Sequence, residues 1–156
     1  GVSTSRQTER GMQMYYSELV KKACAIMYDA HKDDMDKGGY PYVFHPFYLA
    51  TQMDDETSTC AALLHDVIED HGDRYSFDDL ARAGFPESVI RALRLLTHES
   101  GVPYMDYVMA LAKDPIARKV KMADLRHNMD TRRVNGARAK KYDLYLQAIH
   151  YLERLE

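Results

Sequence analysis

The sequence predicts an all-α fold, a single-domain helical bundle. Apolar residues recur at intervals of three and four in several segments, which is the spacing of a buried helix face. No segment sustains the alternation of apolar and polar residues that is typical of a half-buried strand. No linker-like stretch divides the 156 residues, so we expect one domain over residues 1–156, with residues 1–12 poorly ordered.

The first half of the chain contains three predicted helices and one predicted loop. Tyr16, Val20, Ala23 and Met27 follow the spacing of a buried helix face. Residues 31–42 (HKDDMDKGGYPY) are polar and contain two glycines and a proline, so we expect a loop there. In order, helices are expected over residues 16–30, over residues 45–53, and from residue 55 or 57 to residue 71.

The second half contains the clearest helix starts. The run Ser76-Phe77-Asp78-Asp79 resembles a capping box, in which a serine and an acid three residues later satisfy the first backbone N–H groups. Asp114-Pro115 supplies an N-cap and a first-turn proline for a longer helix. The expected helices cover residues 76–84, 86–96, 104–112 and 114–133, and a final helix includes residues 142–152.

Composition and known motifs exclude several classes of protein. A net charge of −3, from 21 basic and 24 acidic residues, gives no overall reason to expect a nucleic-acid partner. No apolar run is long enough for a membrane span, and we expect a cytoplasmic protein whose two cysteines are reduced. No Walker loop, glycine-rich dinucleotide turn, CxxC pair or HExxH motif occurs, which excludes the kinase, dehydrogenase, zinc-ribbon and metalloprotease interpretations.

Ionisable residues are concentrated in residues 61–70, AALLHDVIED, within an apolar helical segment. Buried charges are costly unless they are paired or bound to a metal, so His65, Asp66, Glu69 and Asp70 need an explanation. His65 and Asp66 can both reach a divalent metal if further ligands come from elsewhere in the fold. The structural alternative is a solvated helix end with incidental acids.

Other predicted helices supply the further ligands. His45 begins one helix, and Asp124 lies within KMADLRHN on another. Two imidazoles and two carboxylates form a mixed set that suits Mn²⁺, Fe²⁺ or Zn²⁺ and is too rich in nitrogen for calcium. His31 and His71 each close a predicted helix, and we expect them to act as helix caps or hydrogen-bond partners.

This order of a histidine, a His-Asp pair and a distant aspartate resembles the HD phosphohydrolase superfamily. The segments PYVFHP, AALLHDVIED and KVKMADLRHNM are similar to three consecutive blocks of the alarmone hydrolases. These are the hydrolase half of the RelA/SpoT proteins and the free-standing small alarmone hydrolases. The resemblance extends from about Tyr16 to Leu152, and the chain is similar to the hydrolase-only form.

The resemblance implies an enzyme of the stringent response. Its activity would be metal-dependent hydrolysis of the 3′-pyrophosphate of guanosine 3′,5′-bis(diphosphate)-like alarmones, with release of pyrophosphate and GDP or GTP. The implied cofactor is one Mn²⁺ ion, and the partner is a small-molecule nucleotide. The implied metal ligands are His45, His65, Asp66 and Asp124. Glu69 and Asp70 would orient and activate the attacking water, and Lys37, Asn128, Lys141 and Tyr145 would contact the substrate.

Two departures from the family pattern bear on substrate recognition. Asp36 stands where the family has an arginine that stacks on the guanine base, and a carboxylate cannot stack as a guanidinium does. Leu125 and Arg126 occur in reverse order, which moves a positive charge by about 100° around the helix. An HD-domain nucleotidase or phosphodiesterase acting on another nucleotide, such as an adenosine alarmone, is therefore the alternative. A non-catalytic nucleotide-binding domain is a third hypothesis, and the acid pair argues against it.

Overall fold

The computed structural model describes residues 14–130, 132 and 141–156, and their structure confirms the all-α prediction. Within these residues, β-structure is limited to one isolated bridge between Met35 and Pro41. The segment expected to be poorly ordered, residues 1–12, lies outside the described residues, as do the residues of the expected helix end at Asn135-Gly136.

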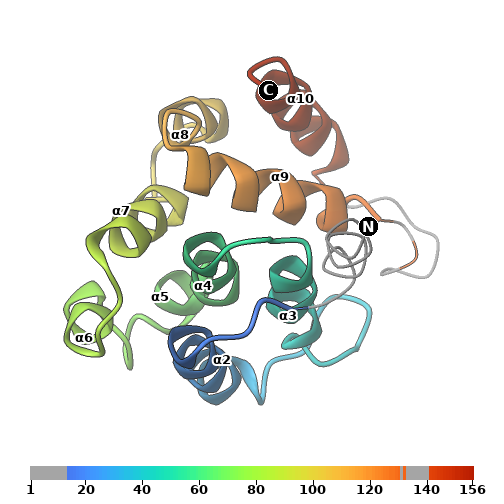
Figure 1. Cartoon of the computed structure of the whole chain (residues 1–156). Helices are drawn as coiled ribbons and strands as arrows, with labels where there is room; N and C mark the ends of the chain where they lie inside the picture. The colour runs from blue at the N-terminus through green and yellow to red at the C-terminus, as the bar shows by residue number, and fades with distance from the viewer. Residues whose placement is uncertain (1–13, 131, 133–140) are drawn as a thin grey trace, which may run out of the picture.

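Figure 1 shows how the helices are arranged. They are α2 (Glu18–His31), α3 (Phe44–Thr51), α4 (Glu56–Leu64), α5 (Val67–His71), α6 (Phe77–Arg82), α7 (Glu87–Leu96), α8 (Tyr104–Leu111), α9 (Pro115–Asn128) and α10 (Tyr142–Glu153). Helix α4 packs against α2, α3, α7 and α9, and α9 also packs against α10. None of the helices in the described part combines the length and the apolar character required to cross a bilayer.

Helix α4 is the centre of the core. Every residue from Ser58 to Leu64 is buried, so the helix has no solvent face beyond its first two residues. Its start is satisfied by Asp55, whose Oδ1 accepts hydrogen bonds from the Ser58 backbone N–H at 2.8 Å and from the Ser58 hydroxyl at 2.6 Å. The Thr59 hydroxyl donates to the backbone carbonyl of Asp55 at 2.6 Å. The fixed helix brings its C-terminal end, and with it His65, into the interior.

The predicted central helix is not continuous, so this prediction was wrong in one respect. Helix α4 ends at Leu64 and α5 begins at Val67, with His65 and Asp66 between them. Asp66 has φ −109° and ψ 0°, which is the bridge region and not the helical one. Apolar periodicity could not show this break, because His65 keeps helical backbone angles and one non-helical residue, Asp66, leaves the apolar pattern around it intact.

Helix α9 is shorter than expected. It was predicted to reach about residue 133, but it ends at Asn128, and Met129 is its C-cap. The backbone N–H of Asp130 donates to the carbonyl of His127, three residues back, at 3.2 Å, which tightens the turn. The capping box at Ser76 and Asp79 is confirmed, and α10 is confirmed with Ile149 and Leu152 buried.

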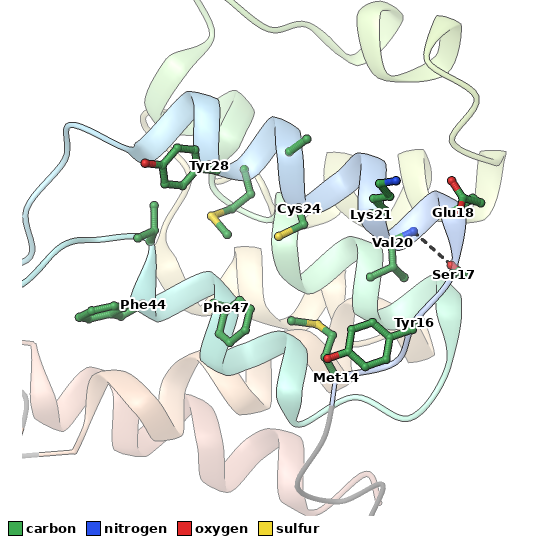
Figure 2. Close-up of a pocket in the computed structure, with 13 residues that line it drawn as sticks. Met14, Tyr16, Ser17, Glu18, Val20, Lys21, Cys24, Tyr28, Phe44 and Phe47 are labelled. Carbon is green, nitrogen blue, oxygen red and sulfur yellow. Dashed lines mark hydrogen bonds between the residues drawn. The ribbon is translucent and has the colours of Figure 1, made fainter.

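An apolar cavity of about 1030 Å³ lies between α2 and α3. Figure 2 shows Val20 and Cys24 of α2 and Phe47 of α3 beside it, with Met14 and Tyr16 at one end. It shares no lining residue with the polar pocket around His45, His65 and Asp124, which is described below. None of the residues that the sequence predicts to bind metal or substrate lines this apolar cavity.

Candidate metal centre and active-site pocket

Three buried side chains converge from three separate helices. His45 comes from α3, His65 from the end of α4 and Asp124 from α9, and each offers one ligand atom within 4.8 Å of the other two. The residues are 3%, 4% and 6% exposed, respectively. His45 Nε2 lies 2.8 Å from Asp124 Oδ1, and His65 Nε2 lies 3.7 Å from the same oxygen. The structure thus brings together three of the four ligands expected from the sequence.

The orientation of His65 leaves one nitrogen available for a metal. As the C-cap of α4, His65 places Nδ1 2.7 Å from the backbone carbonyl of Ala62, which fits Nδ1–H as the donor. Nε2 is buried and has no hydrogen-bond partner among the described residues. An outer hydrogen bond that fixes the tautomer while the other nitrogen faces the site is the usual arrangement of a metal-ligating histidine. The residues present therefore fit a bound metal ion.

Asp66, the fourth expected ligand, lies next to this group. Its Oδ2 is 3.1 Å from His65 Nε2. The same oxygen accepts a hydrogen bond from the hydroxyl of Tyr42, which comes from the loop before α3. Asp66 is thus beside the buried group of His45, His65 and Asp124, and that group can bind a metal ion.

The charge of Asp124 is compensated by a lysine whose side chain is only 12% exposed. Lys121, one turn earlier on α9, places Nζ 3.0 Å from Asp124 Oδ2. Burial alone would raise the pKa of Asp124, but Lys121, His45 and His65 outweigh it and hold the pKa well below its ordinary value. The Lys121 ammonium also lies 5.6 Å and 5.2 Å from the ring centroids of Tyr104 and Tyr107. Asp124 is therefore an ionised carboxylate even without a metal.

The two histidines of the group differ in their protonation. Burial lowers the pKa of His45, which favours the neutral imidazole that a metal requires. Burial also acts to lower the pKa of His65, but the carboxylates of Asp66 and Asp124 outweigh it and raise this pKa well above its ordinary value. Metal binding must then displace a proton from His65, so affinity for the metal should rise with pH.

His127 supports His45 from behind. Their Nδ1 atoms are 2.7 Å apart, and their rings are stacked with centroids 5.0 Å apart. Tyr48 stacks on the ring of His127, with the two ring centroids 4.3 Å apart. This contact fixes the orientation of His45, because the nitrogen that faces Asp124 is opposite the one that faces His127.

The group opens into a polar pocket of about 220 Å³. Of the other predicted site residues, Glu69, Asn128, Lys141 and Tyr145 line it. Asn128 Nδ2 donates to Asp124 Oδ1 at 3.1 Å, and Glu69 Oε1 accepts a hydrogen bond from the backbone N–H of His98 at 2.8 Å. Lys37 and Asp70 are not among the described residues that line the pocket. Burial, followed by Asp66 and Glu69, raises the pKa of Asp70 to about 6.

Several pocket residues were not singled out by the sequence. Lys121 could have been found, since it precedes Asp124 by three residues and therefore lies on the same helix face. Tyr104, Tyr107 and His98 also line the pocket, and the Tyr104 hydroxyl is buried without a hydrogen-bond partner among the described residues. These three come from α8 and the segment before it, and no local spacing in the sequence connects them to the other residues of the site.

Asp36, the departure from the family pattern, has a structural role in its loop. Its Oδ1 accepts hydrogen bonds from the backbone N–H groups of Gly38 and Tyr40, both at 2.9 Å. The backbone N–H of Asp36 donates to the Tyr40 carbonyl at 2.8 Å. The side chain thus closes a tight turn next to Lys37.

Comparison with known proteins identifies relatives of the chain. A GTP pyrophosphokinase of Streptomyces coelicolor is 31% identical over 144 residues, which cover 84% of this chain and 15% of that protein. A guanosine-3′,5′-bis(diphosphate) 3′-pyrophosphohydrolase of Aquifex aeolicus is 28% identical over 145 residues, covering 83% of this chain and 20% of the relative. The bifunctional (p)ppGpp synthase/hydrolase SpoT of Escherichia coli K12 is 30% identical over 128 residues, which cover 72% of this chain and 18% of that protein. No protein-family model matches the chain.

A solved structure shares the fold. It is that of a metazoan ortholog of SpoT described as hydrolysing ppGpp; the TM-score is 0.72 at 24% identity, over 91% of this chain and 89% of that one. The fold and the buried His/Asp group define an HD-type protein. The chain is similar to the hydrolase domains of RelA/SpoT-type proteins. It spans a fifth or less of the length of the curated relatives named above, 15%, 20% and 18%.

The Lys121–Asp124 pair yields a test of the metal centre. Replacing Lys121 with methionine leaves the buried Asp124 carboxylate without its cation, so metal-free protein should lose about 3–5 kcal/mol of unfolding free energy. A divalent metal supplies the missing positive charge and should restore part of the loss. Thermal denaturation of Lys121→Met with and without Mn²⁺ measures both effects.

The matched control is Lys119→Met. Lys119 pairs with Asp54 at the surface, where the two side chains are 38% and 75% exposed, so its loss should cost at most about 1 kcal/mol. Equal stability of the two variants, or no difference between them in the response to metal, would contradict the proposed compensation.

Proposed function

We propose that the chain is a metal-dependent phosphohydrolase that removes the 3′-pyrophosphate of (p)ppGpp-like nucleotides and releases pyrophosphate with GDP or GTP. One observation carries the proposal: the buried group His45, His65 and Asp124 opens into a pocket that has an acid, Glu69, and a lysine, Lys141, in its wall. The relatives, which include proteins named as 3′-pyrophosphohydrolases of guanosine bis(diphosphate), support this assignment.

The metal would be a single Mn²⁺ ion held by His45, His65, Asp66 and Asp124. When bound, a divalent cation supplies Lewis-acid chemistry, since it lowers the pKa of water and stabilises charge on phosphoryl oxygens. Fe²⁺ and Zn²⁺ suit the same mixed nitrogen and oxygen ligands. The proposed cytoplasmic location agrees with the two free cysteines of the chain.

Glu69 and Asp70 would position and deprotonate the attacking water. Glu69 lines the pocket, and its bond to the His98 backbone N–H holds one carboxylate oxygen in place. Asp70 is not among the residues that line the pocket, but its raised pKa of about 6 is near the value that suits a general base at neutral pH. Transfer of a proton from water to one of these carboxylates would direct the nucleophile at the phosphorus next to the ribose 3′ oxygen.

The remaining pocket residues would bind the substrate. Lys141, Tyr145 and Asn128 line the pocket and can contact the phosphates and the sugar. At about 220 Å³ the pocket is smaller than typical ligand sites of about 300–1,000 Å³, so it suits the reacting diphosphate and the adjoining ribose. The base would then lie toward the loop that contains Lys37, where Lys37 can meet a further phosphate.

An adenosine alarmone is the second candidate substrate. The observation that favours it is Asp36, whose carboxylate bonds to the backbone of its own loop and offers no guanidinium for stacking on guanine. Base selectivity therefore has to come from other residues of the site.

The decisive assay is release of pyrophosphate from ppGpp and ppApp in the presence of Mn²⁺. We expect pyrophosphate from at least one of the two 3′-diphosphates and none from the corresponding 3′-monophosphates. Asp66→Ala should abolish the activity because it removes a proposed metal ligand. If neither 3′-diphosphate is cleaved by metal-loaded protein, the hydrolase proposal is wrong.

The pH dependence tests the role of Asp70. A general base is active when ionised, so kcat/KM should rise with pH through the pKa of Asp70, which lies at about 6 without metal and lower with a bound cation. Asp70→Asn should reduce kcat/KM by about 10²–10⁴-fold and remove this acidic limb.

Asp73→Asn, at an exposed position two residues beyond α5, serves as the control and should leave the profile unchanged. An acidic limb that persists unchanged in Asp70→Asn would assign the base to another group, and Glu69→Gln would be the next variant to measure.

A further inference from the structure

A second cluster of metal-competent side chains lies on the other side of the loop that contains Tyr42. It consists of His31 at the end of α2, Asp34 in the following loop and His71 at the end of α5. Each offers one ligand atom within 4.8 Å of the other two, the same criterion that the His45, His65 and Asp124 group meets. None of these three residues lines the polar pocket.

The two imidazoles converge on one carboxylate oxygen. His31 Nδ1 lies 3.0 Å and His71 Nε2 lies 2.7 Å from Asp34 Oδ2. The rings meet nearly at right angles, with an interplanar angle of 70° and centroids 5.1 Å apart. Two nitrogens from different helices and a carboxylate between them form a compact set of three donors of the kind that binds Zn²⁺.

The burial of His31 is not explained by the hydrogen bonds of the cluster. Its side chain is 0% exposed, and its Nε2 has no hydrogen-bond partner among the described residues. The described residues contain three such buried side-chain atoms, and two of them are histidine nitrogens, one in each cluster. The nitrogen that faces Asp34 is His31 Nδ1, so the unsatisfied Nε2 is not the atom that an ion in this cluster would bind. The observation that points to an ion is the convergence of His31 Nδ1 and His71 Nε2 on Asp34 Oδ2.

We propose that His31, Asp34 and His71 bind a second divalent cation, of the Zn²⁺ class, with a water molecule as the fourth ligand. The side chains of Asp34 and His71 are 34% and 20% exposed, so the site is open to solvent on one side while His31 closes the other. Two neutral imidazoles, one carboxylate and one water complete a tetrahedral set. This proposal does not depend on the hydrolase activity proposed above.

The position of the cluster gives the second ion a structural role. Asp34 also accepts, through its backbone carbonyl, a hydrogen bond from the Tyr42 backbone N–H at 2.9 Å, and Tyr42 donates to Asp66 of the first group. His71 ends the short helix that contains Glu69 and Asp70. An ion shared by Asp34 and His71 would therefore fix the loop with Tyr42 relative to the helix with the acid pair.

Metal content tests the proposal directly. Metal-free chain is equilibrated with Zn²⁺, separated from free ions by gel filtration, and analysed for zinc per chain. We expect two zinc ions for the unmodified chain and one for His71→Ala. Asp34→Asn keeps the size of the side chain and is the second variant, should His71→Ala fail to fold; it should also bind one ion fewer. His150→Ala, at an exposed histidine of α10, is the control and should bind two.

The outcomes separate the alternatives. If His71→Ala and Asp34→Asn, as folded proteins, bind as many zinc ions as the unmodified chain, the cluster is a hydrogen-bonded contact and the proposal is overturned. It is also overturned if His150→Ala loses an ion, since zinc would then be bound at surface histidines. The count of ions is independent of pyrophosphate release, so the second site and the hydrolase activity can fail separately.

Discussion

The buried carboxylate of Asp124 is the constraint on which the structure around the site depends. A charge in this position is tolerated only if it is paired, and it is in contact with His45, Lys121 and Asn128, which come from α3 and α9. The same oxygens that accept these hydrogen bonds are the ones a metal would share. One arrangement of charges therefore stabilises the core and orients the side chains of the candidate metal site. A bound cation would enter a site whose side chains are already positioned by these contacts.

The central helix α4 connects the site around Asp124 to the rest of the core, because it packs against α2, α3, α7 and α9. Because all its residues from Ser58 to Leu64 are buried, neighbouring helices pack on every side of it, and its end can only be placed in the interior. The chain leaves the helix at His65 and Asp66, so the two residues of the HD pair occur where regular structure stops. Irregular backbone at a functional site is common, and here it lies between α4 and the short helix α5, which contains Glu69 and Asp70.

The sequence was sufficient for the helical class, for most helix starts and for the His45, His65 and Asp124 group. Asp55, Ser76 and Asp114 marked helix starts because capping depends on a few adjacent residues. The break at Asp66 and the early end of α9 could not be predicted, since neither interrupts the apolar pattern of the sequence. The same reason explains Tyr104, Tyr107 and His98: they reach the pocket through packing of α8 and its preceding segment, which no spacing in the sequence records. The meeting of Asp34 with His71 is likewise a product of the fold.

Tyr42 contacts residues of both His/Asp clusters. Its hydroxyl donates a hydrogen bond to Asp66, which lines the pocket, and its backbone N–H donates to the carbonyl of Asp34, which lies outside the pocket. The proposed activity depends on a divalent cation held by His45, His65 and Asp124. The most direct measurement is anomalous X-ray diffraction from crystals grown with Mn²⁺. We expect a manganese peak within coordination distance of His45 Nε2, His65 Nε2 and Asp124. A structure in which His45 and Asp124 keep their 2.8 Å contact and no peak occurs beside them, at a Mn²⁺ concentration that saturates binding in solution, would contradict that claim.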